Sequence, residues 1–143
     1  MSAARIFLIV FVIIETLNML ELYFLKDESV FNGVSIFTAW EKSKQDPEIH
    51  NFVRYLVNWV AGTKLIFIML LIVILLTASE QTQLLSAAAL VLSIASFFWR
   101  LFPLIRKMDK EDQIEPKNYS VVLGWMIGGF MAVFIVPLLL ALY

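Results

Sequence analysis

The sequence contains no cysteine and a single histidine, His50. Without cysteine the chain forms no disulfide and no thiolate metal site, and cysteine-based catalysis is excluded. One histidine cannot supply a haem held by two imidazoles, and it disfavours a histidine-based zinc site. We therefore expect neither a metal nor another cofactor. The formal net charge of -1 also lacks the basic surface that nucleic-acid binding requires, so no nucleic-acid partner is expected.

Apolar residues dominate instead: 61% of the 143 residues are hydrophobic and the mean hydropathy is +0.84. A soluble domain of this length leaves too much surface in water to hide them. They fall into four blocks, each long enough for the roughly 20 residues that span a bilayer. The sequence predicts an all-α integral membrane protein, a single domain with four transmembrane helices in an antiparallel bundle. The predicted helices cover residues 6–25, 47–76, 84–105 and 119–143.

Sequence signals indicate where these helices begin. Asp46 can cap the first N–H groups of the second helix, Pro47 suits the first helical position, and Glu48 places negative charge at the positive end of the helix dipole. The segment 77–80, Thr-Ala-Ser-Glu, fits a capping box and predicts a tight hairpin into the third helix. Asn118 is expected to cap the fourth helix.

The distribution of lysine and arginine predicts the orientation in the membrane. Arg5 is the only basic residue on one side of the predicted bundle. The two long connectors and the adjoining helix ends, on the opposite side, hold nine basic residues: Lys26, Lys42, Lys44, Arg54, Arg100, Arg106, Lys107, Lys110 and Lys117. Because basic residues concentrate on the cytoplasmic side, both connectors should be cytoplasmic and both termini non-cytoplasmic. We expect a multi-pass membrane protein, in the plasma membrane if the cell is prokaryotic.

Ionisable residues inside the predicted helices form a polar stripe. At 100° per residue, each set of three below falls within an arc of about 120°. The first helix carries Glu15, Asn18 and Glu21. The second carries Arg54, Asn58 and Lys64. Intramembrane charges are costly and mark functional or paired positions.

Depth matching between these antiparallel helices predicts an ion pair. If Leu25 lies level with Arg54, then Glu15 lies level with Lys64, about 15 Å from the cytoplasmic boundary. Glu21 then approaches Asn58. Two explanations stay open for the Glu15–Lys64 pair. It fixes the register of the two helices, or it belongs to a proton or ion relay or to the polar floor of a ligand pocket.

Arg100 in the third helix has two interpretations. It is either an anchor whose charge reaches the cytoplasmic interface, or a partner for Glu21. In the second case Glu21, Arg54, Asn58 and Arg100 form one cytoplasmic cluster, which could receive an anionic headgroup or a carboxylate.

Small residues recur on the last two predicted helices. The third helix has Ser86, Ala89, Ser93 and Ser96, and the fourth has Gly124, Gly128 and Ala132. Neighbouring members of each set are three or four positions apart, and small residues at this spacing let helix backbones approach closely in lipid. It predicts packing of the third helix on the fourth, with a homo-oligomer seam on the fourth helix as the alternative.

Two short resemblances are present. The segment from Asp46-Pro47 to Arg54-Tyr-Leu-Val-Asn58 is similar to the start of the second helix in the MAPEG family of glutathione-dependent membrane enzymes. That resemblance implies a homotrimer with glutathione between subunits. Where the family has an acidic residue shortly after the asparagine, this sequence has Ala61. Of the family's basic stretch after the first helix, only Lys26 is present. Glu15 in the first helix is similar to the essential glutamate of small multidrug resistance transporters, but Lys64 would neutralise it. We assign the chain to neither family.

Three functional hypotheses follow, in this order. The first is a non-enzymatic membrane protein, either an accessory subunit or a module that binds lipid or a small amphiphile, because no catalytic set of residues comes together. The second is a small proton- or ion-coupled transporter that uses Glu15 and Lys64. The third is a membrane enzyme of the MAPEG type acting at Arg54 and Arg100. The expected partners are the lipid bilayer and either further copies of the chain or a larger membrane complex.

Overall fold

The computed structural model describes residues 2–25 and 33–140, without the side chains of residues 136–138 and 140. The described residues form six helices and no strand. These are α1 (Ala3–Phe24), α2 (Thr38–Ser43), α3 (Pro47–Thr77), α4 (Glu80–Ala95), α5 (Phe97–Lys110) and α6 (Tyr119–Leu140). The predicted end of the fourth helix, at Tyr143, lies outside the described residues, as does Lys26.

Three helical segments are long and apolar enough to cross a membrane: α1, α3, and the segment Glu80–Lys110 that combines α4 and α5. The apolar helix Tyr119–Ile135 within α6 is shorter. The chain is therefore all-helical over its described part and has the composition of a membrane protein, as predicted.

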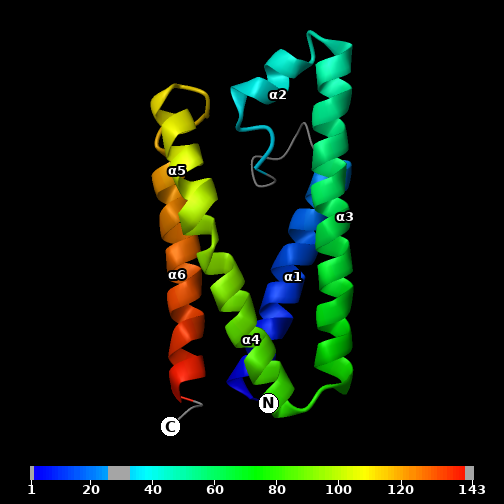
Figure 1. Ribbon diagram of the computed structural model, residues 1–143, viewed down its shortest axis with the longest axis vertical. Helices are drawn as coiled ribbons and strands as arrows, with labels where there is room; N and C mark the ends of the chain where they lie inside the picture. The colour runs from blue at the N-terminus through cyan, green and yellow to red at the C-terminus, as the bar shows by residue number, and fades with distance from the viewer. Residues whose placement is uncertain (1, 26–32, 141–143) are drawn as a thin grey trace.

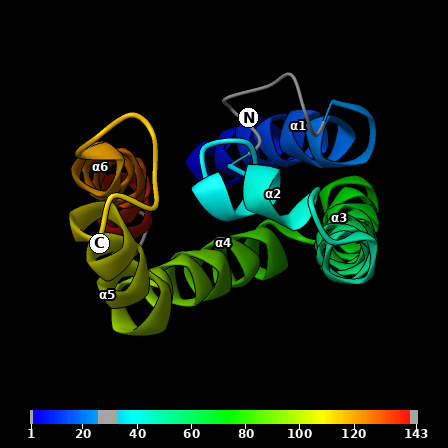
Figure 2. The same ribbon diagram turned by 90° about the horizontal axis from the view of Figure 1, so that it is seen from above.

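The helices form two pairs that diverge from one end of the molecule (Figure 1). The antiparallel helices α1 and α3 make one pair, and α5 and α6 make the other. Figure 2 shows α4 running between the two pairs. The beginning of α1, the α3–α4 turn and the end of α6 lie at one end of the molecule (Figure 1). The opposite end holds α2 and the α5–α6 connector, and we call it the α2 end.

The start of α3 is where the sequence predicts it. The Oδ1 atom of Asp46 accepts hydrogen bonds from the N–H groups of Glu48 (3.0 Å) and Ile49 (3.3 Å), and Pro47 occupies the first turn. The capping box predicted for residues 77–80 is not formed, and the cap lies two residues further along the chain. Ser79 caps α4 by accepting from the N–H of Thr82 at 3.3 Å. Thr77 remains helical because its hydroxyl donates back to the Val73 carbonyl at 2.8 Å.

The tightest packing lies where the two helix pairs converge, away from the α2 end. The α1 residues Phe7, Leu8 and Phe11 are buried there against α3, α4 and α6. Phe7 contacts Phe134 of α6, with ring centroids 3.8 Å apart, and Phe130 contacts the same α1 surface. A shared apolar core therefore joins the two pairs at this end.

A second buried cluster holds α1 against α3 nearer the α2 end. It comprises Met19 and Leu22 of α1 with Ala61 and Ile68 of α3. Ala61 is completely buried, because its small side chain lets the two backbones approach closely.

The third predicted helix, residues 84–105, is broken at Ser96. The Ser93 hydroxyl donates to the Ala89 carbonyl at 2.9 Å, and the Ser96 hydroxyl donates to the Ser93 carbonyl at 2.6 Å. The N–H groups of Ser96 and Trp99 bond to carbonyls three residues earlier. Such back-bonding and three-residue turns bend helices. As a result α5 leaves α4 at an angle and packs on α6.

The two long connectors meet at the α2 end. The N–H of Thr38 donates to the Gln113 carbonyl at 3.0 Å, and the N–H of Glu115 donates to the Ile36 carbonyl at 2.9 Å. Together they form an isolated antiparallel bridge between Phe37 and Ile114. We call this contact the connector bridge. It links the first connector, which follows α1, to the segment that precedes α6.

Helix α2 lies against the first turns of α3. The Trp40 ring is 5.0 Å from the His50 ring, and the Ser43 hydroxyl is hydrogen-bonded to His50 Nδ1 at 2.9 Å. Trp40 is buried within the protein.

Candidate functional site

The predicted ion pair between α1 and α3 is present in the structure. Lys64 Nζ donates to Glu15 Oε2, and both side chains are largely enclosed, with 27% and 22% of their surfaces exposed. The pairing follows from the antiparallel alignment of the two helices, which also brings Gly62 close to the hydroxyl of Tyr23. Neutralising each charge with its partner is what lets both groups lie within apolar helices.

Of the two interpretations of Arg100, the structure does not support the one that joins it to a cluster with Glu21. Arg100 is exposed on α5, with its guanidinium 5.4 Å from the centre of the Trp99 ring. Because of the break at Ser96, α5 packs against α4 and α6 rather than against α1 or α3. Arg54 and Asn58 are exposed on α3, and Glu21 is partly buried on α1. Among the described residues no ion pair joins Glu21 to either arginine.

The small-residue stripe of the third predicted helix is not its packing face. Ala89, Ser93 and Ser96 are exposed, and Ser86 is partly buried. The face of α4 that is buried against its neighbours instead carries Gln83, Ala87, Leu90 and Val91. The serine hydroxyls donate to backbone carbonyls of their own helix, and those of Ser93 and Ser96 contribute to the break at Ser96.

The glycines of the fourth predicted helix lie at a contact with the third predicted helix, as expected, in the part of that helix that forms α5. A Cβ atom added to Gly124 would lie 2.7 Å from the Cε2 atom of Phe102, and one added to Gly128 would lie 4.0 Å from Phe98. Ala132 is exposed. The rings of Phe98 and Phe102 therefore lie against these glycines, where the prediction expected small residues of the third helix.

A cavity of about 330 Å³ lies between the two helix pairs near the α2 end. We call it the central cavity. Helix α5 provides one wall with five apolar side chains that fall within an arc of about 100° at helical periodicity. These residues are Phe97, Leu101, Leu104, Ile105 and Met108.

The remaining walls come from three other parts of the chain. Asn18 lines the cavity from α1, and Tyr119 and Leu123 line it from α6. Gly33, Ile36 and Phe37 of the first connector cover it at the α2 end, where the connector bridge holds that segment in place. Asn18 is the one member of the predicted polar stripe among these lining residues. The walls are mainly apolar with a few polar groups, as in sites that bind small organic molecules.

The sequence reading missed the α5 wall, although a signal for it was present. Positions 97, 101, 104, 105 and 108 follow the spacing of one helical face. Two of them, Leu101 and Leu104, are more than half exposed. The prediction placed residues 97–105 at the end of one continuous helix and Met108 in the connector after it, because nothing local in the sequence reveals the change of direction at Ser96.

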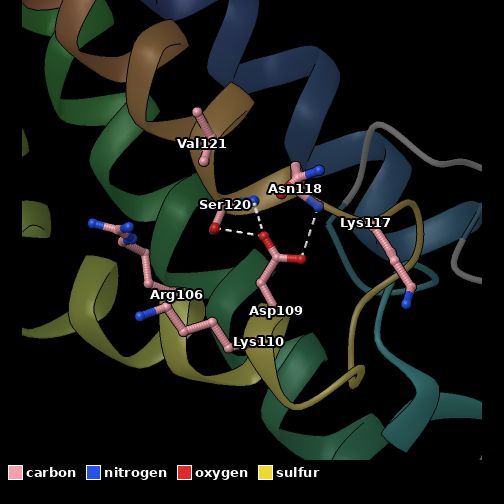
Figure 3. Close-up of a pocket in the computed structure, with 7 residues that line it drawn as sticks. All are labelled: Arg106, Asp109, Lys110, Lys117, Asn118, Ser120 and Val121. Atoms are coloured by element: carbon pink, nitrogen blue, oxygen red, sulfur yellow. Dashed lines mark hydrogen bonds between the residues drawn. The ribbon is translucent and has the colours of Figure 1, made fainter.

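The start of α6 is capped by a residue from another helix. Asp109 of α5 accepts hydrogen bonds from the N–H of Asn118 at 3.0 Å and from the N–H and hydroxyl of Ser120 at 2.9 and 2.5 Å (Figure 3). Asn118, the predicted cap, has a positive φ of 66° and serves as a donor. Asp109 thereby fixes Tyr119 at the edge of the central cavity.

The part of the chain that the structure describes contains no group of three or more histidine, aspartate or glutamate side chains placed to hold a metal ion. Searches against family models, curated proteins and solved structures found no match to this chain.

Proposed function

We propose that this chain is a non-enzymatic membrane protein that holds a lipid or another small amphiphile in the central cavity. The observation that carries the proposal is the cavity itself. Its volume of about 330 Å³ is within the range of about 300–1,000 Å³ typical of small-molecule sites. Its α5 wall is apolar throughout, and an acyl chain is the complement of such a surface.

Polar groups at the cavity edge suit the other end of an amphiphile. Asn18 and Tyr119 line the cavity from opposite helix pairs. A hydroxyl and an amide can orient a neutral headgroup without the cost of burying a charge. Gly33 and Phe37 border the same space. We therefore favour a ligand with one apolar chain and an uncharged polar end.

The proposed topology places this cavity in the cytoplasmic half of the bilayer. Four crossings, with α4 and α5 sharing one of them, put both termini on the non-cytoplasmic side. The α2 end then faces the cytoplasm, in agreement with the bias of basic residues towards that end. The lipid bilayer is the chain's first partner, and an accessory role in a larger membrane complex is compatible with a bound amphiphile.

In this proposal the Glu15–Lys64 pair is scaffolding that aligns α1 with α3. Neither residue lines the central cavity. A Glu15→Gln, Lys64→Met double variant that folds and still binds the amphiphile supports this role. Loss of binding from a folded double variant would assign the pair to the site.

Filling the central cavity tests the proposal directly. We expect Leu101→Trp to reduce the amount of amphiphile that copurifies with the full chain, because the larger side chain occupies the space of the ligand. Native mass spectrometry of the protein, released from a mild detergent, measures the bound mass and its stoichiometry. Leu92→Trp is the matched control, since Leu92 is 74% exposed on α4 and is not among the cavity residues.

The proposal fails if the wild-type protein carries no bound amphiphile above the level of the detergent alone. It also fails if Leu101→Trp and Leu92→Trp retain the same amount. A decrease confined to Leu101→Trp, with an unchanged unfolding temperature, supports it.

A second candidate is a proton- or ion-coupled transporter, favoured by an ion pair that lies inside apolar helices one turn from Asn18. It predicts that proteoliposomes containing the protein dissipate a pH gradient faster than empty vesicles, and that Glu15→Gln removes the excess flux. Equal rates with and without protein would eliminate this candidate. The Arg54–Asn58 element lies outside the central cavity, and we do not extend the enzyme hypothesis to it.

A further inference from the structure

The side of α5 that faces away from the central cavity is basic. Arg106, Lys107 and Lys110 are all exposed and fall within an arc of about 100° at helical periodicity. Glu111 lies 3.8 Å from Lys107 and offsets part of its charge. Within the described residues, no ion pair involves Arg106 or Lys110. Two basic groups thus remain available to an anion at this surface.

Arg106 lines two hollows on this side of α5. One, of about 360 Å³, is bordered by Pro103, Arg106, Lys107, Lys110 and Glu111. The other, of about 160 Å³, lies between Arg106, Lys110 and the start of α6. Figure 3 shows Arg106 and Lys110 extending to one side of Asp109, and Lys117 extending to the other.

Neighbouring acidic groups offset part of this positive charge. The Asp109 carboxylate lines the smaller hollow and keeps its negative charge, with its oxygens hydrogen-bonded to Asn118 and Ser120 at the start of α6. Lys117 is paired with Asp112 at 2.8 Å. Four basic side chains therefore face the three carboxylates of Asp109, Glu111 and Asp112, which leaves a net positive charge, with Arg106 and Lys110 outside any ion pair of the described residues.

An apolar groove of about 270 Å³ begins at the same arginine. Phe98, Phe102, Val121, Gly124 and Trp125 line it together with Arg106. Gly124 contributes no side chain, and the Trp125 ring stands at the edge with 79% of its surface exposed. The groove follows α5 and α6 away from the α2 end, towards the interior of the proposed membrane.

Arg106 and Val121 join the basic hollow to the groove, because both residues line each of them. The Arg106 guanidinium lies 5.8 Å from the centre of the Phe102 ring, so the charge is held above the apolar surface. A basic pocket directly above an apolar channel is complementary to a molecule with an anionic head and an acyl chain.

We propose that this outer face of α5 and α6 binds an anionic glycerophospholipid of the surrounding membrane. The phosphate lies against Arg106 and Lys110, and one acyl chain follows the groove past Gly124. This site is on the opposite side of α5 from the central cavity, so it does not depend on an amphiphile being bound there. In the proposed topology it faces the cytoplasmic leaflet, which carries the anionic lipids.

The test measures lipid preference in the full chain. The purified protein receives equal amounts of phosphatidylglycerol and phosphatidylcholine with identical acyl chains, and native mass spectrometry counts the retained lipid. We expect a preference for phosphatidylglycerol. Arg106→Gln with Lys110→Gln should weaken phosphatidylglycerol binding by roughly tenfold to thirtyfold, since each basic residue near the membrane surface adds about 1 kcal/mol. Lys42→Gln with Lys44→Gln removes the same charge from α2 and should leave the preference intact.

A second pair of variants tests the groove. Val121→Trp should obstruct the junction between the basic hollow and the groove, and so reduce retention of phosphatidylglycerol. Val133→Trp makes the same change at an exposed position of α6 outside the groove and should have no effect.

Three results would overturn the proposal. One is equal phosphatidylglycerol binding by the Arg106/Lys110 and Lys42/Lys44 double variants. Another is equal binding by the two tryptophan variants. The third is displacement of the lipid by glycerophosphoglycerol, which has no acyl chain, at an equal concentration, because the site would then recognise a soluble phosphate. Loss of the central-cavity amphiphile in Leu101→Trp, with phosphatidylglycerol retained, would show that the two sites are separate.

Discussion

Glu15 and Lys64 are 49 positions apart in the chain, yet they form an ion pair. This contact was predictable because helix geometry fixes both the depth and the face of each residue along two antiparallel helices. Arg100 was not predictable in the same way. Its position depends on the break at Ser96, so depth alone wrongly suggests proximity to Glu21.

The pair should show strong energetic coupling. Glu15→Gln leaves the Lys64 charge among apolar helices, and we expect it to lower the free energy of unfolding by about 3 kcal/mol. Adding Lys64→Met removes the remaining charge and should recover most of that loss. Thermal unfolding of both single variants and the double variant in the same detergent gives the coupling. Strictly additive effects would show that the two groups contribute independently.

At the scale of elements, a helix start can be predicted from the sequence when its capping residue is a near neighbour in the chain, as at the start of α3. Pro47 and Asp46 specify its beginning through interactions within four residues. The cap of α6 was not accessible, because Asp109 reaches Ser120 from another helix. The sequence shows that α5 has an apolar face, but it cannot show which face lies towards the cavity and which towards α6. Those contacts exist only once α5 has turned away from α4.

The contact between α5 and α6 should be sensitive to added volume at Gly124. Gly124→Leu forces the side chain against the Phe102 ring, and we expect a loss of about 1–3 kcal/mol in stability. Gly129→Leu is the control, because no atom lies within 4 Å of a Cβ atom added there. The unfolding temperature of the purified protein measures both. Similar decreases in the two variants would argue against a specific role for the Gly124 contact.

At the scale of the whole molecule, the helical class and the presence of long apolar helices follow from the sequence, while the divergence of the two helix pairs does not. Hydropathy reports length and polarity, and it carries no information about the angle between helices. The central cavity results from that angle together with the connector bridge. Ile36 and Ile114, both buried near this bridge, are far apart in sequence and have no shared pattern.

The proposed orientation predicts opposite labelling of the two ends. The chain contains no cysteine, so a single introduced thiol reports one position. In vesicles whose non-cytoplasmic face is outward, Gln81→Cys at the start of α4 should react with an impermeant maleimide. Lys42→Cys on α2 should react only after the membrane is permeabilised. The reverse pattern would invert the topology, and labelling of both without permeabilisation would contradict four crossings.

If the central cavity holds an amphiphile as proposed, the connector bridge should respond to it. Thr38 and Glu115 contribute its two N–H donors, and they belong to segments that continue into different helix pairs. A molecule that wedges the pairs apart pulls these segments in opposite directions. Deuterium exchange at the two amides then becomes a gauge of occupancy, readable from water although the occupant itself is surrounded by lipid and protein.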